Sequence, residues 1–415
     1  MSTAGAVQTP TPAASLTASR VLSIDIFRGL TIAVMIFVNE LAEVRGLPWW
    51  TYHAHGNQDA MTYVDMVFPF FLFIVGMSMP LSIEQRLKRN ASMARLWLHV
   101  ILRSLSLLVL GLILANAEKA DAARMGMKGT VWALAALIGA ALYLNVYPKS
   151  ESGRKYASIV RVIGFAAVVV AFAIFRRTTH DGREAWIDFS YPEILGLIAL
   201  AYFSIALLYI PTRRWRWTAP GWLVLLLMLN VCCSARLIHF PAWLSTYEWP
   251  FGNGSHSALV MAGVVTAHIF FGLRPGTDGR PPAKTATRTA ALFALLALAA
   301  GWLTMPLGIS KIRATPAWTL WNIGAAVLSF TLLYSVCDQW RKTRWAAPVH
   351  PAGANTLLTY LLPDAWYFVL GALNITWLET HMAFGWEGVV KSIVFTLAML
   401  AMAWALTRAR VRLQL

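Results

Sequence analysis

The chain has 415 residues, of which 58% are hydrophobic and only 13% are charged, about half the charged share of an ordinary soluble domain. A soluble globular protein cannot bury this much apolar surface under a polar exterior, so the composition predicts a polytopic membrane protein. The net charge of +16 does not indicate a nucleic-acid partner, because the basic residues lie in small groups between apolar runs.

Residues 1–20 are rich in Ala, Ser, Thr and Pro, and we expect them to form a short disordered tail. The rest of the chain contains twelve apolar stretches, each near the ~20 residues that a helix needs to cross a bilayer. Lipid offers the backbone no hydrogen-bond partners, so each stretch is expected to be a helix. The stretches are residues 22–39, 64–82, 96–115, 130–147, 158–174, 192–210, 221–238, 257–273, 287–305, 316–336, 355–375 and 388–407.

Lys and Arg are concentrated in alternate connections between these stretches. The clearest examples are residues 211–220 and 338–353, which hold three basic residues each. Cytoplasmic loops of membrane proteins carry such an excess. The sequence therefore predicts an all-α bundle of about twelve transmembrane helices with both termini inside.

A first polar group lies at the predicted inner end of the first span. Asp25 and Arg28 are three residues apart, so on a helix they share a face and can pair. One interpretation is a self-neutralised pair that anchors the helix at the interface. The other is that Arg28 binds an anionic ligand such as a phosphate, which suits its forked guanidinium.

A second polar group lies at the predicted outer ends of the first two spans. It contains Asn39, His53, His55 and the sequence Thr62-x-x-Asp65. The last spacing is typical of a capping box at a helix start. His is the usual general base near neutral pH, so a catalytic role is the alternative interpretation. Two His residues without an evident third ligand indicate a metal only weakly, and we expect none.

A third polar group falls in later outer loops. Asn253 and His256 precede the eighth span, and Lys311 and Arg313 precede the tenth. These residues are either loop turns and interfacial charges or the walls of one outward-facing pocket. Trp50, in the first outer loop, belongs either to an interfacial aromatic belt or to a platform for a sugar ring.

The first two spans also resemble a known family. The similarity lies in Ser23 to Ile32, in Met35 to Asn39, and in His55 followed by Thr62-x-x-Asp65-x-Val-Phe-Pro-Phe-Phe-Leu-Phe-Ile-Val-Gly76. These segments are similar to the heparan-α-glucosaminide N-acetyltransferase family, including its bacterial, DUF5009-like homologues. Weaker similarity continues at Pro192 to Tyr202, Lys311 to Trp318 and Gly353 to Tyr360.

The resemblance implies a tail at 1–20 on the cytoplasmic side and a transmembrane acyltransferase domain at 21–415, in the bacterial inner (plasma) membrane. Such an enzyme takes an acetyl group from cytosolic acetyl-CoA and places it on an amino sugar or glycan on the periplasmic side. The resemblance implies that His55 is the active histidine and Asn39 its partner. Asp65 is the motif aspartate, while His53 has no counterpart.

This plan gives each polar group an expected role. The phosphates of acetyl-CoA are expected near Arg28 and Asn355, and eleven residues of helix, about 16 Å, separate Arg28 from Asn39. His55 would act as general base or carry the acyl group, Asn39 would stabilise the oxyanion, and Asp65 would orient the imidazole. The acceptor is expected to contact Trp50, His53, His256 and Lys311.

A secondary transporter of an amino sugar or a related small solute is the alternative. Twelve spans with both termini inside is a common transporter plan. The polar residues, however, are concentrated around the first two spans, and no internal repeat is visible. The expected partners are a small amino sugar or glycan and the lipid bilayer, with no nucleic acid; a homodimer is left open.

Overall fold

The computed structural model describes residues 21–89, 92–148, 150–240, 251–273 and 279–415; the predicted tail at 1–20 lies outside them. Within these residues the chain is almost entirely helical, and a helix coincides with each of the twelve apolar stretches. These helices are α1 (Leu22–Ala42), α2 (Val67–Lys88), α3 (Met93–Ala117), α5 (Gly129–Leu144), α6 (Glu151–Ile174), α7 (Glu193–Thr212), α8 (Thr218–Ser234), α9 (Ser255–Phe271), α10 (Ala283–Leu303), α11 (Pro316–Tyr334), α13 (Thr356–Ala372) and α15 (Gly385–Arg408).

Short elements connect the long helices. They are the helices α4 (Ala122–Met125), α12 (His350–Ala354) and α14 (Trp377–Thr380), the single turns η1 (Trp49–Thr51), η2 (Tyr63–Met66), η3 (Met305–Leu307) and η5 (Arg344–Ala346), and the π-helical turn η4 (Ser335–Gln339). One two-stranded hairpin, β1 (Arg177–Thr178) and β2 (Glu184–Ala185), pairs antiparallel. The hairpin is a small departure from the predicted all-α fold.

The helices establish a multi-pass membrane protein. In the described part of the chain, eight helical segments are long and apolar enough to cross a bilayer: α1, η2–α2, α3, α6, α7, α10, α11–η4 and α15. The apolar helices α5, α8 and α9 are shorter, with 16 or 17 residues, and α13 has 17. The number of twelve spans and their orientation stay predictions.

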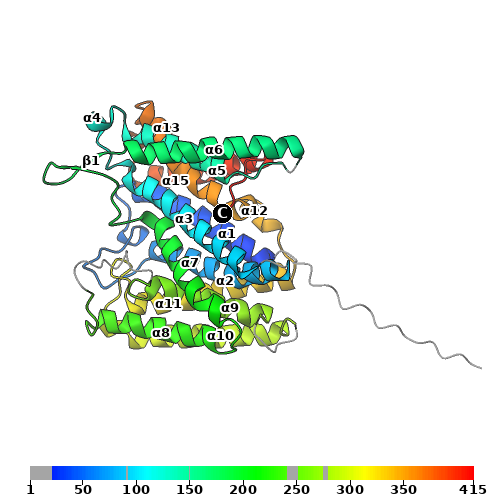
Figure 1. Cartoon of the computed structure of the whole chain (residues 1–415). Helices are drawn as coiled ribbons and strands as arrows, with labels where there is room; N and C mark the ends of the chain where they lie inside the picture. Colours follow the sequence, from blue (N-terminus) through cyan, green and yellow to red (C-terminus); the bar gives the residue numbers. More distant parts are fainter. Residues whose placement is uncertain (1–20, 90–91, 149, 241–250, 274–278) are drawn as a thin grey trace, which may run out of the picture.

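The helices lie side by side in one bundle, with α6 along one flank and α8 and α10 along the opposite flank (Figure 1). The start of α1 and the C-terminal segment lie at the same end, because Asn355 donates to the backbone oxygen of Val411 and Gly353 packs against the backbone of Asp25. We call this the Arg28 end, and the opposite end, where α1 finishes, the His53 end. That both described chain ends share one side agrees with the prediction.

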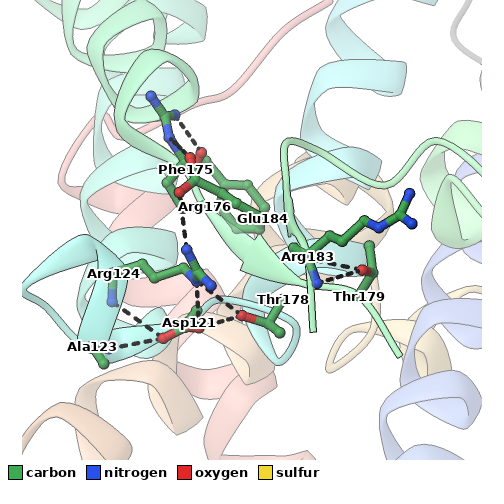
Figure 2. A network of polar contacts seen from close by, with 9 residues as sticks. All are labelled: Asp121, Ala123, Arg124, Phe175, Arg176, Thr178, Thr179, Arg183 and Glu184. Carbon is green, nitrogen blue, oxygen red and sulfur yellow. Dashed lines mark hydrogen bonds and ion pairs between the residues drawn. The ribbon is translucent and has the colours of Figure 1, made fainter. Parts of the chain in front are cut away.

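A network of ion pairs holds the β1–β2 hairpin against α4 (Figure 2). Glu184 accepts from Arg124 Nη1 at 3.1 Å and from Arg176 Nε at 3.0 Å, and Asp121 caps α4 by accepting from the backbone N–H groups of Ala123 and Arg124. Exposed pairs of this kind contribute little to stability, because water and salt screen them. Their effect is to fix how the hairpin sits on the bundle.

The centre of the bundle is α9, which is buried along nearly its whole length. It packs against α2 through glycines: a Cβ at Gly76 would overlap the backbone oxygen of Val260, and one at Gly263 would overlap that of Phe73. Small residues let helices approach closely where no hydrophobic effect drives them together. This packing encloses α9 between other helices and fixes where its first turn, with His256, lies.

Replacing Gly76 with Ala should therefore destabilise the protein, by about 1–3 kcal/mol for an overpacked contact. Thermal unfolding in detergent measures the effect. Gly221→Ala in α8 is the matched control, because a Cβ at Gly221 meets nothing within 4 Å. Equal unfolding temperatures of the two variants would contradict the proposed packing.

Candidate active site

Two loops dock on each other at the His53 end, residues 43–62 after α1 and residues 304–315 before α11. Asp59 Oδ1 of the first loop lies 2.5 Å from Arg313 Nη2 of the second and also accepts from the N–H of Ile309 at 3.2 Å. These two hydrogen bonds, that from Arg313 first, lower the pKa of the Asp59 carboxyl. A second contact joins Lys311 Nζ to His53 Nε2 at 3.1 Å. Asp59 was not predicted as a contact residue, although it is one of the chain's few acidic residues.

The carboxylate of Asp65 organises the first loop. Its side chain is fully buried, so both oxygens need partners. Oδ2 accepts from the N–H of Thr62 at 2.9 Å and of Ala54 at 3.3 Å, and Oδ1 lies 2.7 Å from His53 Nδ1. The capping box predicted from Thr62-x-x-Asp65 is confirmed. The Asp65 side chain thus starts the second span and also holds the first loop, residues 43–62. We call this loop, which carries His53 and His55, the histidine loop.

The structure places the two histidines differently from the sequence expectation. Asp65 contacts His53 and not His55, which was expected to receive it. The His55 side chain is exposed and has no hydrogen-bond partner among the described residues. Asp65 instead fixes the backbone between the two rings, at Ala54. Gly56, next to His55, lies over Ile312, where a Cβ would be 3.2 Å from the Ile312 side chain. Asp65 therefore orients the loop that carries His55 rather than the His55 ring.

Lys311 completes the contacts of His53. When the ammonium donates to Nε2, the ring proton lies on Nδ1 and is donated to Asp65. Burial lowers the pKa of Lys311, while the negative charge of Asp65 raises it. Asp65, His53 and Lys311 therefore form one coupled chain of charges and hydrogen bonds.

A cavity of about 610 Å³ opens beside this chain of contacts. Its polar lining includes Asn253, His256, Lys311 and Arg313, so the residues of the third polar group border one space. That this space faces outward and holds the acceptor stays a prediction. Its other walls include residues of α7, Phe68 at the start of α2, and Phe251. Neither His53 nor His55 is in this lining, but Lys311 joins the cavity to the histidine loop.

Buried polar contacts hold the second loop in place. Asn230, in the apolar helix α8, donates to the backbone oxygen of Ala314 at 2.9 Å, and Asn253 donates to the same oxygen at 3.1 Å. Ala314 itself has a positive φ of 47°, a strained conformation for a residue with a Cβ. The loop that carries Lys311 is thus fixed by contacts that local sequence gave no reason to expect.

Asn39 and Trp50 lie apart from these contacts. Asn39 is exposed on α1, and no hydrogen bond joins its side chain to His53 or His55. Trp50 is 53% exposed and lies with its ring 6.3 Å from that of Tyr63, as expected for an interfacial aromatic residue or an open platform.

Glu40, the residue after the exposed Asn39, is buried. Glu40 forms an ion pair with Lys391 of α15 at 3.1 Å and accepts from the Tyr367 hydroxyl at 2.7 Å. The sequence signal for this pair was available, since both residues are ionisable groups in or beside apolar stretches. The pair fixes the end of α1 against α13 and α15.

The two predicted donor-binding residues lie at the Arg28 end. Arg28 pairs with Asp25 at 3.3 Å, as predicted, and also donates to Ser78 at 2.7 Å; its side chain keeps 23% exposure. Asn355 is 3% exposed, and its amide bonds to Thr407, Val411 and the N–H of Leu413. Asn355 therefore fixes the C-terminal segment, and only Arg28 stays accessible to a ligand.

Because Asp65 raises the pKa of Lys311, Asp65→Asn should move the deprotonation of Lys311 to lower pH. The pH dependence of Lys311 labelling by an amine-reactive reagent, followed by mass spectrometry, measures this shift. Asp121→Asn is the control and should leave the profile in place, because the Asp121 carboxylate contacts Ala123, Arg124 and Thr178 and the pKa of Lys311 responds to burial and Asp65. An unchanged or upward-shifted profile in Asp65→Asn would refute the coupling.

Within the described residues, no three His, Cys, Asp or Glu side chains are grouped so that they could hold a metal ion.

A family model described as a domain of unknown function (DUF5009) matches residues 20–241. Heparan-alpha-glucosaminide N-acetyltransferase of Mus musculus is 37% identical over 99 residues, 24% of this chain and 14% of that protein. The Homo sapiens protein is 38% identical over 112 residues, 27% of this chain and 16% of that protein. The chain thus matches less than a fifth of the length of these curated relatives. Because residues 20–241 are more than half of the chain, the protein belongs to the DUF5009 family.

Proposed function

We propose that the protein is a membrane acyltransferase that moves an acetyl group from acetyl-CoA to an amino sugar or glycan at the His53 end. The observation that carries the proposal is the Asp65–His53–Lys311 chain of contacts beside a cavity of about 610 Å³. The partial similarity to an N-acetyltransferase supports the reaction class.

The cavity suits a neutral amino sugar. Phe68 and Phe251 provide apolar surface for a sugar ring, and Asn253 and Lys311 provide donors for hydroxyl groups. No Asp or Glu is among its described lining residues, whereas Lys311 and Arg313 are basic. This charge disfavours an ammonium ion, so the acceptor amine binds in its neutral, nucleophilic form.

In the proposed reaction the acceptor amine attacks the thioester carbonyl, its proton passes to His55, and the thiolate of coenzyme A leaves. In the covalent variant the imidazole of His55 attacks first and then passes the acetyl group to the amine. His55 is the candidate because its ring is exposed and unpaired among the described residues, whereas Nε2 of His53 already accepts from Lys311. Asp65 and His53 act as positioning residues, and Asn39 is the proposed donor to the oxyanion.

The donor must reach this end from the opposite side of the bundle. Arg28 and Asn39 lie on the same uninterrupted helix α1, about 16 Å apart along its axis. We propose that a phosphate of acetyl-CoA meets the exposed part of Arg28 and that the pantetheine arm covers this distance. The side of the membrane on which each end lies follows from the basic loops, which are predicted to be cytoplasmic. The Arg28 end would then face the cytoplasm, and the His53 end the opposite side.

Purified protein in lipid nanodiscs should transfer labelled acetyl from acetyl-CoA to one member of a panel of amino sugars. His55→Ala should lower kcat by about 10²–10⁴-fold, the range for loss of a general base. His180→Ala, at an exposed histidine of the hairpin turn, is the matched control and should retain full activity. Label that stays on the protein without acceptor would identify the covalent route.

Full turnover by folded His55→Ala would remove the proposed role of His55. Absence of transfer by the unmodified protein, together with acceptor uptake into proteoliposomes without acetyl-CoA, would instead favour the transporter. The two outcomes differ in whether the unmodified protein transfers label at all.

A further inference from the structure

A second cavity, of about 350 Å³, lies near the Arg28 end, away from the candidate active site. Its walls come from four parts of the chain: α3, the end of α5 with the residues after it, α6, and the C-terminal segment. The polar lining residues are His99, Arg103, Ser106, Tyr143, Asn145, Arg161 and Gln414. It shares no lining residue with the cavity of about 610 Å³.

The charged side chains in the lining of this cavity are all basic. Arg103 and Arg161 are both in the lining, and no Asp or Glu is among the described lining residues. Arg103 Nε is buried without a hydrogen-bond partner in the described structure, and its guanidinium lies over the ring of Tyr202 at 4.8 Å. Such a guanidinium at membrane depth is costly unless an anion is supplied to it.

Arg161 approaches the cavity from α6. It donates to the backbone oxygen of Asn145 at 3.4 Å and lies over the ring of Tyr147 at 5.7 Å. One carbonyl and one ring leave most of its five N–H donors available. Two guanidinium groups from different helices therefore border one space, an arrangement that suits a phosphate.

The cavity lies beside outward apolar surface. Leu98, Leu102 and Leu105 of α3 are 55%, 47% and 51% exposed, and Leu102 is itself a lining residue. On α6, Ile159 and Val162 are 61% and 68% exposed, close in sequence to Arg161. A ligand whose phosphate lies between the arginines can thus extend apolar chains along these helices without leaving the bilayer.

We propose that this cavity binds the head-group phosphate of an anionic phospholipid, with its acyl chains along α3 and α6. Basic pockets between transmembrane helices bind acidic lipids in this way. A soluble phosphate ligand would gain nothing from the exposed leucines of α3, so the apolar flank favours a lipid. The inference is independent of the proposed acyl transfer.

Native mass spectrometry of the delipidated protein, titrated with phosphatidylglycerol or phosphatidylcholine, tests the proposal. The unmodified protein should retain phosphatidylglycerol in preference to phosphatidylcholine. Arg103→Gln and Arg161→Gln should each weaken phosphatidylglycerol binding by about tenfold, as expected for loss of one charge-assisted contact. Arg161 is exposed, so Arg161→Gln tests the site even if Arg103→Gln fails to fold.

Arg95→Gln is the matched control, because Arg95 is an exposed arginine of α3 that does not line the cavity; its lipid binding should be unchanged. Equal retention of the two lipids, or equal losses in Arg95→Gln and Arg161→Gln, would overturn the proposal. Displacement of phosphatidylglycerol by coenzyme A or inorganic phosphate, with the same sensitivity to Arg161→Gln, would assign the cavity to a soluble phosphate instead.

Discussion

The candidate site depends on one buried carboxylate. Asp65 has no exposed side-chain surface, and an ionised carboxylate can stay there only if hydrogen bonds replace the water that it lost. It meets this requirement with the start of the second span at Thr62, with the loop backbone at Ala54 and with the imidazole of His53. Removing it would free the helix start and the histidine loop together.

The segment around Asp65 is also held by a contact from α11. Trp318, fully buried on α11, donates from its indole to the backbone oxygen of Asp65 at 3.2 Å, and its ring lies 6.5 Å from that of His256. The start of α11 therefore contacts both the carboxylate segment and the cavity wall. Since α11 directly follows the loop that carries Lys311, the two loops are fixed by one framework and not by their surface ion pair alone.

Much of this arrangement was accessible from sequence, because its signals are local. Apolar stretches of spanning length predicted the helices, and the spacing of Thr62 and Asp65 predicted the capping box. The pairing of Asp25 with Arg28 followed from helical periodicity. The contact of Asp65 was predicted for the wrong histidine, His55 instead of His53. Which of the two rings reaches Asp65 depends on how the chain turns at Ala54, and residue spacing does not determine that turn.

The contacts that sequence could not give are those between distant segments. Asn355 was expected near the phosphates of acetyl-CoA, whereas in the structure its amide bonds to Thr407, Val411 and Leu413 of the C-terminal segment. Asn230 was not singled out from the sequence, yet its amide donates to Ala314 and holds the loop of Lys311. In a bilayer, a buried amide that no neighbour in sequence can satisfy needs a partner elsewhere in the chain.

That requirement separates the two classes of polar residue in this protein. Asn355, Asn230 and Asp65 are buried and have their hydrogen bonds fulfilled within the chain, so they support structure. His55 and Asn39 lie on the exposed surface of the His53 end with unused hydrogen-bonding groups among the described residues. Groups of the second kind exchange hydrogen bonds to water for hydrogen bonds to a substrate, whereas groups of the first kind would have to break bonds in a low-dielectric interior. This contrast supports the proposal that the exposed imidazole and amide take part in the chemistry, while the buried Asp65 carboxylate holds the loop that carries His55.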